Sequence, residues 1–174
     1  MKYIALLRGI NVGKSIKINM KELKEYFEIL GCINVSTYIN SGNVLFESVE
    51  TKKSLKNKIE EILLNKKEQE IKVLIKTKKE MIDIAQPIPI EWTNDTEQKT
   101  DVAYLFEEID NKEIINELPI KKEYLNLMYV KGAIIWNVTR DNYNKSQLNK
   151  IISYKIYKEL TVRNVNTARY LALN

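Results

Sequence analysis

The chain has 174 residues, of which 44% are hydrophobic and 29% are charged, and its formal net charge at pH 7 is +5. This composition is typical of a globular protein with one large or two small domains, and it excludes fibrous and disordered classes. The absence of histidine excludes Ser-His-Asp and Cys-His catalytic centres and every histidine metal site.

Residues 1–85 predict the order strand, helix, hairpin, helix, strand, short helix. The apolar run at residues 3–7 is the first strand. The next helix begins at Asn19, which has capping-box spacing to Glu22, and ends at Gly31. The remaining elements are a hairpin around Ser41 and Gly42, a helix capped at Ser54, a strand at residues 71–76, and a short helix with a cap at Thr77 and Glu80, stopped by Pro87.

Residues 86–100 hold two of the three prolines and little periodicity, so they are interpreted as a connector. The same order then repeats in residues 101–174. Its elements are a strand at 101–106, a helix capped at Asp110 and Glu113, a hairpin around Lys131 and Gly132, a helix carrying Leu148, Ile151, Ile152 and Ile156, a strand at 161–163, and a helix capped near Asn166.

The repeated order strand, helix, strand, strand, helix, strand is the split βαβ arrangement of ferredoxin-like domains. We therefore expect an α+β protein of two tandem, closely packed ferredoxin-like halves, 1–85 and 101–174. Each half is expected to be an antiparallel sheet with helices on one face.

The remaining composition limits the compartment and the cofactors. The single cysteine, Cys32, excludes an internal disulfide and is expected to be a buried structural thiol. No apolar run approaches the roughly 20 residues of a membrane span, and the start lacks a signal-peptide pattern. We expect a cytoplasmic protein without membrane contact. No acidic spacing indicates a metal, and no cofactor is expected.

Three stretches resemble a known family: LRGINVG at residues 7–13, TYINSGNVLFES at 37–48 and TVRNVNTARYL at 161–171. They are similar to the motifs of domain of unknown function 1697, an uncharacterised and mainly bacterial family. The resemblance implies two ferredoxin-like halves and no established reaction. The chain departs from the family pattern at Lys14, where a second glycine is usual, and at Val165, where a tryptophan is common.

The stretch RGINVGKS at residues 8–15 is close to a nucleotide-triphosphate loop but does not fit it. That loop has four residues between its first glycine and the Gly-Lys pair, whereas three separate Gly9 from Gly13. Its lysine also opens the following helix, whereas Lys14 precedes the expected cap Asn19 by five residues. A triphosphate site is therefore not predicted here.

The arginines point to a different anion site. Arginine is rare beside lysine in this chain, and Arg8 and Arg163 follow or close predicted strands. We expect both to meet at the seam between the halves and to hold an anionic ligand with nearby hydroxyl and amide groups. The candidate ligand-binding residues are Arg8, Gly9, Asn11, Tyr38, Ser41, Asn43, Arg163, Asn164 and Asn166. The alternative interpretation is that these residues tie the two halves together.

Three classes of function stay open. The first is a binding protein for an anionic or polar ligand, either a phosphorylated metabolite or nucleic acid. The RNA-binding aromatic pattern is missing, because Ala133 and Ile134 stand where rings are expected. The second class is a histidine-independent enzyme at the same seam, with no catalytic residue assigned. The third is an interaction protein that uses a sheet edge. The sequence does not assign an oligomeric state.

Overall fold

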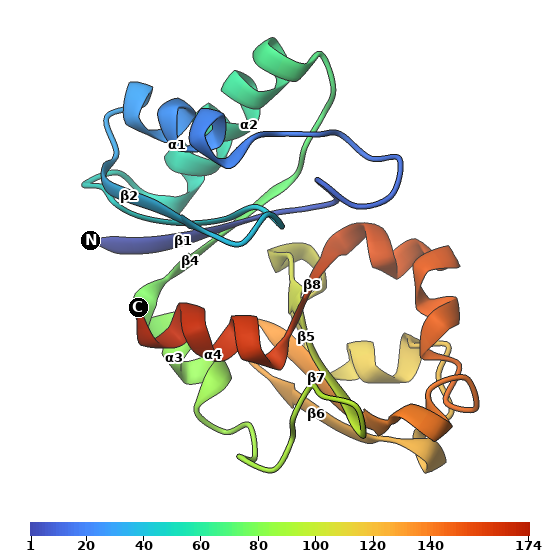
Figure 1. Cartoon of the computed structure of the whole chain (residues 1–174). Helices are drawn as coiled ribbons and strands as arrows, with labels where there is room; N and C mark the ends of the chain where they lie inside the picture. Colours follow the sequence, from blue (N-terminus) through green and yellow to red (C-terminus); the bar gives the residue numbers. More distant parts are fainter. The chain divides into compact units, whose positions relative to one another are not determined.

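Two four-stranded antiparallel sheets form the centres of two units (Figure 1). The computed structural model describes residues 1–174. One unit comprises Met1–Met81 with Asn174, and the other comprises Ile82–Leu173. The protein is therefore a mixed α+β protein.

In the first unit the sheet order is β2-β3-β1-β4, so the first strand is central. Both long helices, α1 and α2, lie on one face of this sheet (Figure 1). The elements are β1 (Lys2–Leu7), α1 (Met20–Ile29), β2 (Ile33–Tyr38), β3 (Asn43–Glu47), α2 (Lys52–Lys67) and β4 (Val73–Thr77). The next helix, α3 (Lys78–Ala85), contains the boundary between the units.

The core of the first unit forms where alternate strand residues meet the apolar faces of the helices. Leu23 and Phe27 of α1 and Ile59 of α2 are completely buried there. The Phe46 ring lies 5.0 Å from the Phe27 ring between centroids, in an edge-on arrangement. Cys32 belongs to the same cluster, and burial raises the pKa of its thiol to about 11. The thiol is thus protonated at neutral pH and structural, as predicted.

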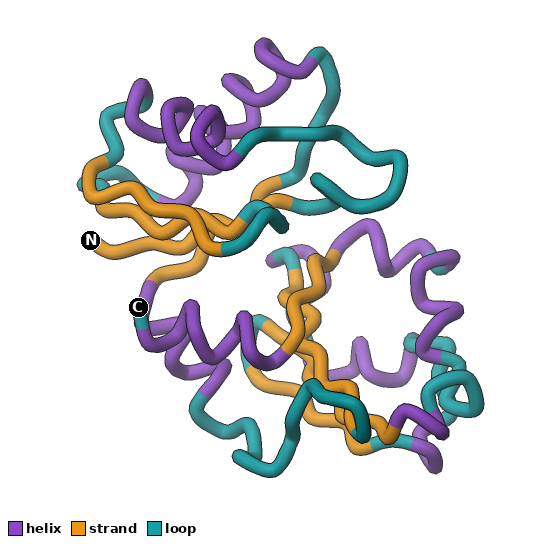
Figure 2. The backbone as a smooth tube through the Cα atoms, in the orientation of Figure 1, coloured by secondary structure: helices purple, strands orange, loops and turns teal.

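The second unit has the sheet order β6-β7-β5-β8, again with its first strand in the centre. Short 3-10 helices occupy the two long connections (Figure 2). The elements are β5 (Gln98–Leu105), η1 (Glu107–Ile109), η2 (Lys112–Glu117), η3 (Lys122–Tyr124), β6 (Asn126–Val130), β7 (Ala133–Thr139), η4 (Arg140–Asn142), η5 (Leu148–Ser153), η6 (Lys155–Glu159), β8 (Leu160–Asn164) and α4 (Val165–Leu173). No helix of the protein combines the length and the apolar character needed to cross a bilayer.

The helices predicted between β5 and β6 and between β7 and β8 are wrong, because 3-10 segments stand in their place. Asp110 does not cap a helix. Its carboxylate accepts hydrogen bonds from the Tyr129 hydroxyl at 3.0 Å and from the Gly132 N–H at 2.8 Å, which commits it to the β6–β7 hairpin. The apolar periodicity marks the core only in part, since Ile114 and Ile151 are buried but Ile152 is 65% exposed.

The helix starts test the predicted caps. Asn19 caps α1, because its side chain accepts from the Lys21 N–H, as predicted. The cap predicted at Ser54 is wrong, because Thr51 accepts from the Ser54 N–H at 3.3 Å and α2 begins at Lys52.

The predicted cap of α3 is confirmed, whereas the predicted cap of α4 lies two residues too late. Thr77 and Glu80 form a reciprocal capping box at the start of α3, as predicted. The last helix is capped by Asn164 and not by Asn166, since the Thr167 N–H donates to the Asn164 side chain at 2.9 Å.

The capping box of α3 makes stability depend on acid pH. Burial alone would raise the pKa of Glu80, but hydrogen bonds from Lys52 and Thr77 outweigh it and lower that pKa below 4.5. A carboxyl whose pKa is lowered by folding stabilises the native state above its unfolded pKa and loses this effect as pH falls. We expect Glu80→Gln to lower the free energy of unfolding at pH 7 by about 1 kcal/mol or less, given its partial exposure.

Urea denaturation at pH 7 and pH 3 measures this effect. The difference between wild type and Glu80→Gln should shrink toward zero at pH 3. A difference of equal size at both pH values would contradict the capping role of the ionised carboxylate.

Candidate functional site

The loop after β1 is held by one asparagine, Asn11. Its backbone N–H donates to the Ile16 carbonyl at 2.9 Å, and its side-chain oxygen accepts from the Ile18 N–H at 3.0 Å. Its side-chain amide donates to the carbonyls of Ile18 at 2.9 Å and Asn40 at 2.8 Å. Asn11 thus closes the loop and joins it to the β2–β3 hairpin.

The same loop does not have the geometry of a phosphate-binding loop. Lys14 lies exposed on the loop, and α1 begins only at Met20, where Asn19 already caps it. The Lys17 ammonium donates to the Gly13 carbonyl at 3.1 Å. Neither lysine therefore stands at a helix N-terminus, where phosphate binds most favourably.

The β2–β3 turn packs directly against this loop. Asn43 is completely buried, and its amide donates to the Tyr38 carbonyl at 3.0 Å and the Ser41 hydroxyl at 2.9 Å. The Gly42 carbonyl accepts from the Leu7 N–H at 2.9 Å. Hydrogen bonds thus join four candidate residues of the first unit through the loop and the turn: Asn11, Tyr38, Ser41 and Asn43. The other two, Arg8 and Gly9, follow β1 directly.

These six residues have different roles in the structure. Asn11 and Asn43 have structural roles in the loop and the turn. Arg8 is the cationic member, and its backbone N–H donates to the Lys72 carbonyl at 2.9 Å. Gly9 is exposed at φ +67°, a conformation that favours glycine.

The three candidates of the second unit lie at the end of β8 and the start of α4. Asn164 is the cap of α4, which gives its side-chain oxygen a structural role. Asn166 is exposed, and its amide donates to the Asn94 carbonyl at 3.5 Å. Arg163 differs from both, because only 7% of it is exposed. Its Nη1 donates to the Thr161 hydroxyl at 2.9 Å and to the Val162 carbonyl at 2.8 Å.

Burial of Arg163 makes the charged form of its guanidinium less favourable than it is in water. Burial lowers the pKa of the guanidinium to about 10, and the phenols of Tyr104 and Tyr157 oppose this shift. The group therefore stays positively charged at neutral pH. Tyr104 is completely buried, and burial raises the pKa of its phenol.

Tyr104 is the residue that the sequence analysis missed. It stands directly opposite Thr161 in the β5–β8 ladder, and Val102 stands opposite Arg163. Because directly opposed residues and residues two apart share a face of a sheet, Tyr104, Thr161 and Arg163 lie on the same face. The alternation of strand residues around Tyr104 was visible in the sequence, but the register between β5 and β8 was not.

The other two arginines have clear structural tasks in the second unit. Arg140 donates to the Asp95 carbonyl through Nε at 3.0 Å and Nη2 at 2.8 Å. Arg169 donates to the Pro89 carbonyl at 2.8 Å. Both hold the segment before β5, so their planar forks serve the fold.

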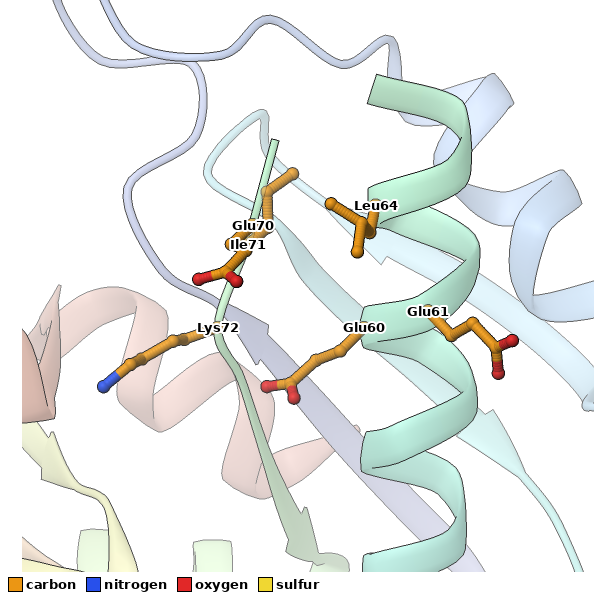
Figure 3. A pocket seen from close by; sticks show the side chains of 6 residues that line it. All are labelled: Glu60, Glu61, Leu64, Glu70, Ile71 and Lys72. Atoms are coloured by element: carbon orange, nitrogen blue, oxygen red, sulfur yellow. The ribbon is translucent and has the colours of Figure 1, made fainter. Parts of the chain in front are cut away.

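A surface hollow of about 370 Å³ lies between α2 and the residues before β4. Glu60, Glu61, Leu64, Glu70, Ile71 and Lys72 line it (Figure 3). Its carboxylates do not converge: Glu61 points away from Glu70 (Figure 3), and Glu60 accepts from the Val73 N–H at 2.8 Å. No group of three or more acidic, cysteine or histidine side chains in the protein could hold a metal ion.

Comparison with known proteins places the chain in a family. A family profile described as "Protein of unknown function (DUF1697)" matches residues 1–136. The chain belongs to the DUF1697 family. The matched range includes the Arg8 loop and the Asn43 turn, whereas Arg163 lies beyond it. The description of the family names no activity.

A solved structure is similar along nearly the whole chain. It is described as the structure of conserved bacterial protein SP0830 from Streptococcus pneumoniae, with 27% identity and a TM-score of 0.83. The alignment covers 99% of this chain and 97% of that one. No curated protein matches the chain.

The contact between the turn and the loop predicts a strict need for glycine at position 42. Gly42 has φ +75°, and a Cβ there would lie 2.8 Å from the Leu7 Cβ and from Ile10. Gly31 has φ +82° with open space around it. We expect Gly31→Ala to cost about 1–2 kcal/mol from backbone strain. Gly42→Ala should cost about 1–3 kcal/mol more, from the steric clash.

Chemical denaturation of the two variants separates strain from packing. Equal losses in the free energy of unfolding for Gly31→Ala and Gly42→Ala would contradict the close contact between turn and loop.

Proposed function

We propose that the protein binds an anionic ligand and that Arg163 holds its negative charge. The observation that carries this proposal is a guanidinium on a sheet, 7% exposed, whose pKa burial lowers to about 10. Removing a cation from water destabilises the folded protein, and an apolar residue of similar size is often at least as stable at such a place. The negative charge of a bound ligand would offset part of this cost.

The burial of Arg163 favours a phosphorylated or otherwise anionic metabolite over nucleic acid. Nucleic-acid backbones bind mainly through exposed lysines and arginines that neutralise many phosphates at once. The net charge of +5 is spread along the chain, and Arg163 is not exposed. We therefore infer a small ligand.

We also infer that the two units are tandem ferredoxin-like halves. The sheet orders β2-β3-β1-β4 and β6-β7-β5-β8 support this, because they are the same order counted from each first strand. The last residue of each central strand also makes the same bond. Leu7 and Leu105 donate to the carbonyls of Gly42 and Gly132, at 2.9 and 3.0 Å.

This correspondence gives Arg163 a counterpart in the first unit. Val73 and Leu160 begin β4 and β8 opposite Leu7 and Leu105, so Lys76 occupies the position of Arg163. Lys76 is also buried, with 5% exposed. A buried cation at the same strand position in both halves supports the inferred duplication.

The interpretation that Arg8 shares a ligand with Arg163 stays a prediction. So does the alternative that the motif residues tie the two halves together. A histidine-independent enzyme and an interaction protein are further predictions from the sequence that no specific observation favours.

Ligand-dependent thermal stabilisation tests the anion site. A ligand at 100 times its Kd stabilises the native state by about 2.7 kcal/mol. Among inorganic phosphate, phosphate monoesters and a short oligonucleotide, we expect a small anion to raise the Tm of the wild type. Arg163→Gln should abolish the rise. Arg140→Gln, which removes the same charge from an exposed position of the second unit, should retain it.

Two further variants cover the case that Arg163→Gln does not fold and test whether Arg8 takes part. If Arg163→Gln does not fold, Arg163→Lys keeps the charge, removes the planar fork and should weaken binding. Arg8→Gln should weaken binding of the same anion only if Arg8 shares that ligand. The proposal is wrong if a folded Arg163 variant binds as tightly as wild type, or if only the oligonucleotide binds and does so with steep salt dependence.

A further inference from the structure

The phenol of Tyr104 has no hydrogen-bond partner, although its side chain is completely buried on β5. A buried hydroxyl without a partner destabilises a protein, and such groups are rare in native structures. Other buried polar side chains on the same face are paired. The Asn137 amide, for example, donates to the Thr100 hydroxyl at 2.8 Å. The Tyr104 hydroxyl is thus the exception on this face, and a bound ligand could supply its missing partner.

Tyr104 lies beside the guanidinium that we propose as the anion-binding group. It is directly opposite Thr161 in the ladder, and the Thr161 hydroxyl accepts a hydrogen bond from Arg163 at 2.9 Å. The phenol and the guanidinium also influence each other's pKa. The phenol and the guanidinium therefore lie on the same face of the sheet, diagonally across the β5–β8 ladder.

We propose that the Tyr104 hydroxyl donates a hydrogen bond to a compact oxyanion held by Arg163, and so completes the binding site of a small molecule. This inference rests on the proposed function. Burial keeps the phenol protonated at neutral pH, so the hydroxyl acts as a donor to an anion. Because both groups are buried, the oxyanion belongs to a small ligand and not to a polymer. Phosphate and carboxylate share this chemistry.

The variant Tyr104→Phe tests the proposal in the full chain. It removes only the hydroxyl and keeps the buried ring. Without ligand, we expect a Tm a few degrees higher than that of wild type, because a buried unpaired group is lost. With inorganic phosphate or acetate as probe, we expect binding about 10- to 100-fold weaker in isothermal titration calorimetry, the loss typical of a hydrogen bond to a charged group.

The control is Tyr154→Phe, which removes a hydroxyl from a tyrosine of the same unit that is 47% exposed. It should change neither the Tm nor the affinity. Phosphate binding alone would identify a phosphate group, and acetate binding alone a carboxylate. Either result supports the proposal if Tyr104→Phe weakens the binding of that probe.

The failures of the two proposals can be told apart. If wild type binds a probe, Arg163→Gln does not, and Tyr104→Phe binds like wild type, the role of Tyr104 is overturned while the anion site stands. A lower Tm for ligand-free Tyr104→Phe also overturns it, since the hydroxyl would then have a structural partner. If wild type binds neither probe, or Arg163→Gln binds equally well, both proposals fail.

Discussion

The end of the central strand is the constraint on which each unit depends. Leu7 in β1 and Leu105 in β5 donate their last ladder bonds to a glycine carbonyl, and the following residues, Arg8 and Phe106, donate to the residues just before β4 and β8. These bonds fix three strands at one end of each sheet. The chain that leaves the strand must then turn sharply. In the first unit Asn11 and Gly42 support this turn, and hydrogen bonds bring together the candidate residues Asn11, Tyr38, Ser41 and Asn43.

The strands and the helices of the first unit were predictable because their signals are local. Apolar runs, capping pairs such as Thr77 with Glu80, and glycines in tight turns act within a few residues. The second unit was harder, because the same apolar spacing fits both α-helix and 3-10 turns. The choice there depends on a long-range contact. Asp110 binds the hairpin around Gly132, 22 residues away, instead of capping a helix.

The candidate site was predictable only in part. Sequence reasoning selected Arg163 because arginine is rare in this chain, and the structure buries it. The same reasoning selected Asn11, Asn43 and Asn164, whose side chains hold a loop, a turn and a helix start. Amides that bind ligands and amides that bind backbone look alike in a sequence. Tyr104 was missed because its position beside Arg163 depends on the pairing of strands more than 50 residues apart in the chain.

Native mass spectrometry of the protein as purified tests the central claim most directly, since it detects a bound compound of any identity. The wild-type chain should carry an additional mass of a small anionic compound. Arg163→Gln should lose that mass, and Arg140→Gln, with the same net charge, should keep it. The same adduct on Arg163→Gln, or a wild-type chain without any adduct, would contradict the assignment of Arg163 as the residue that holds an anion.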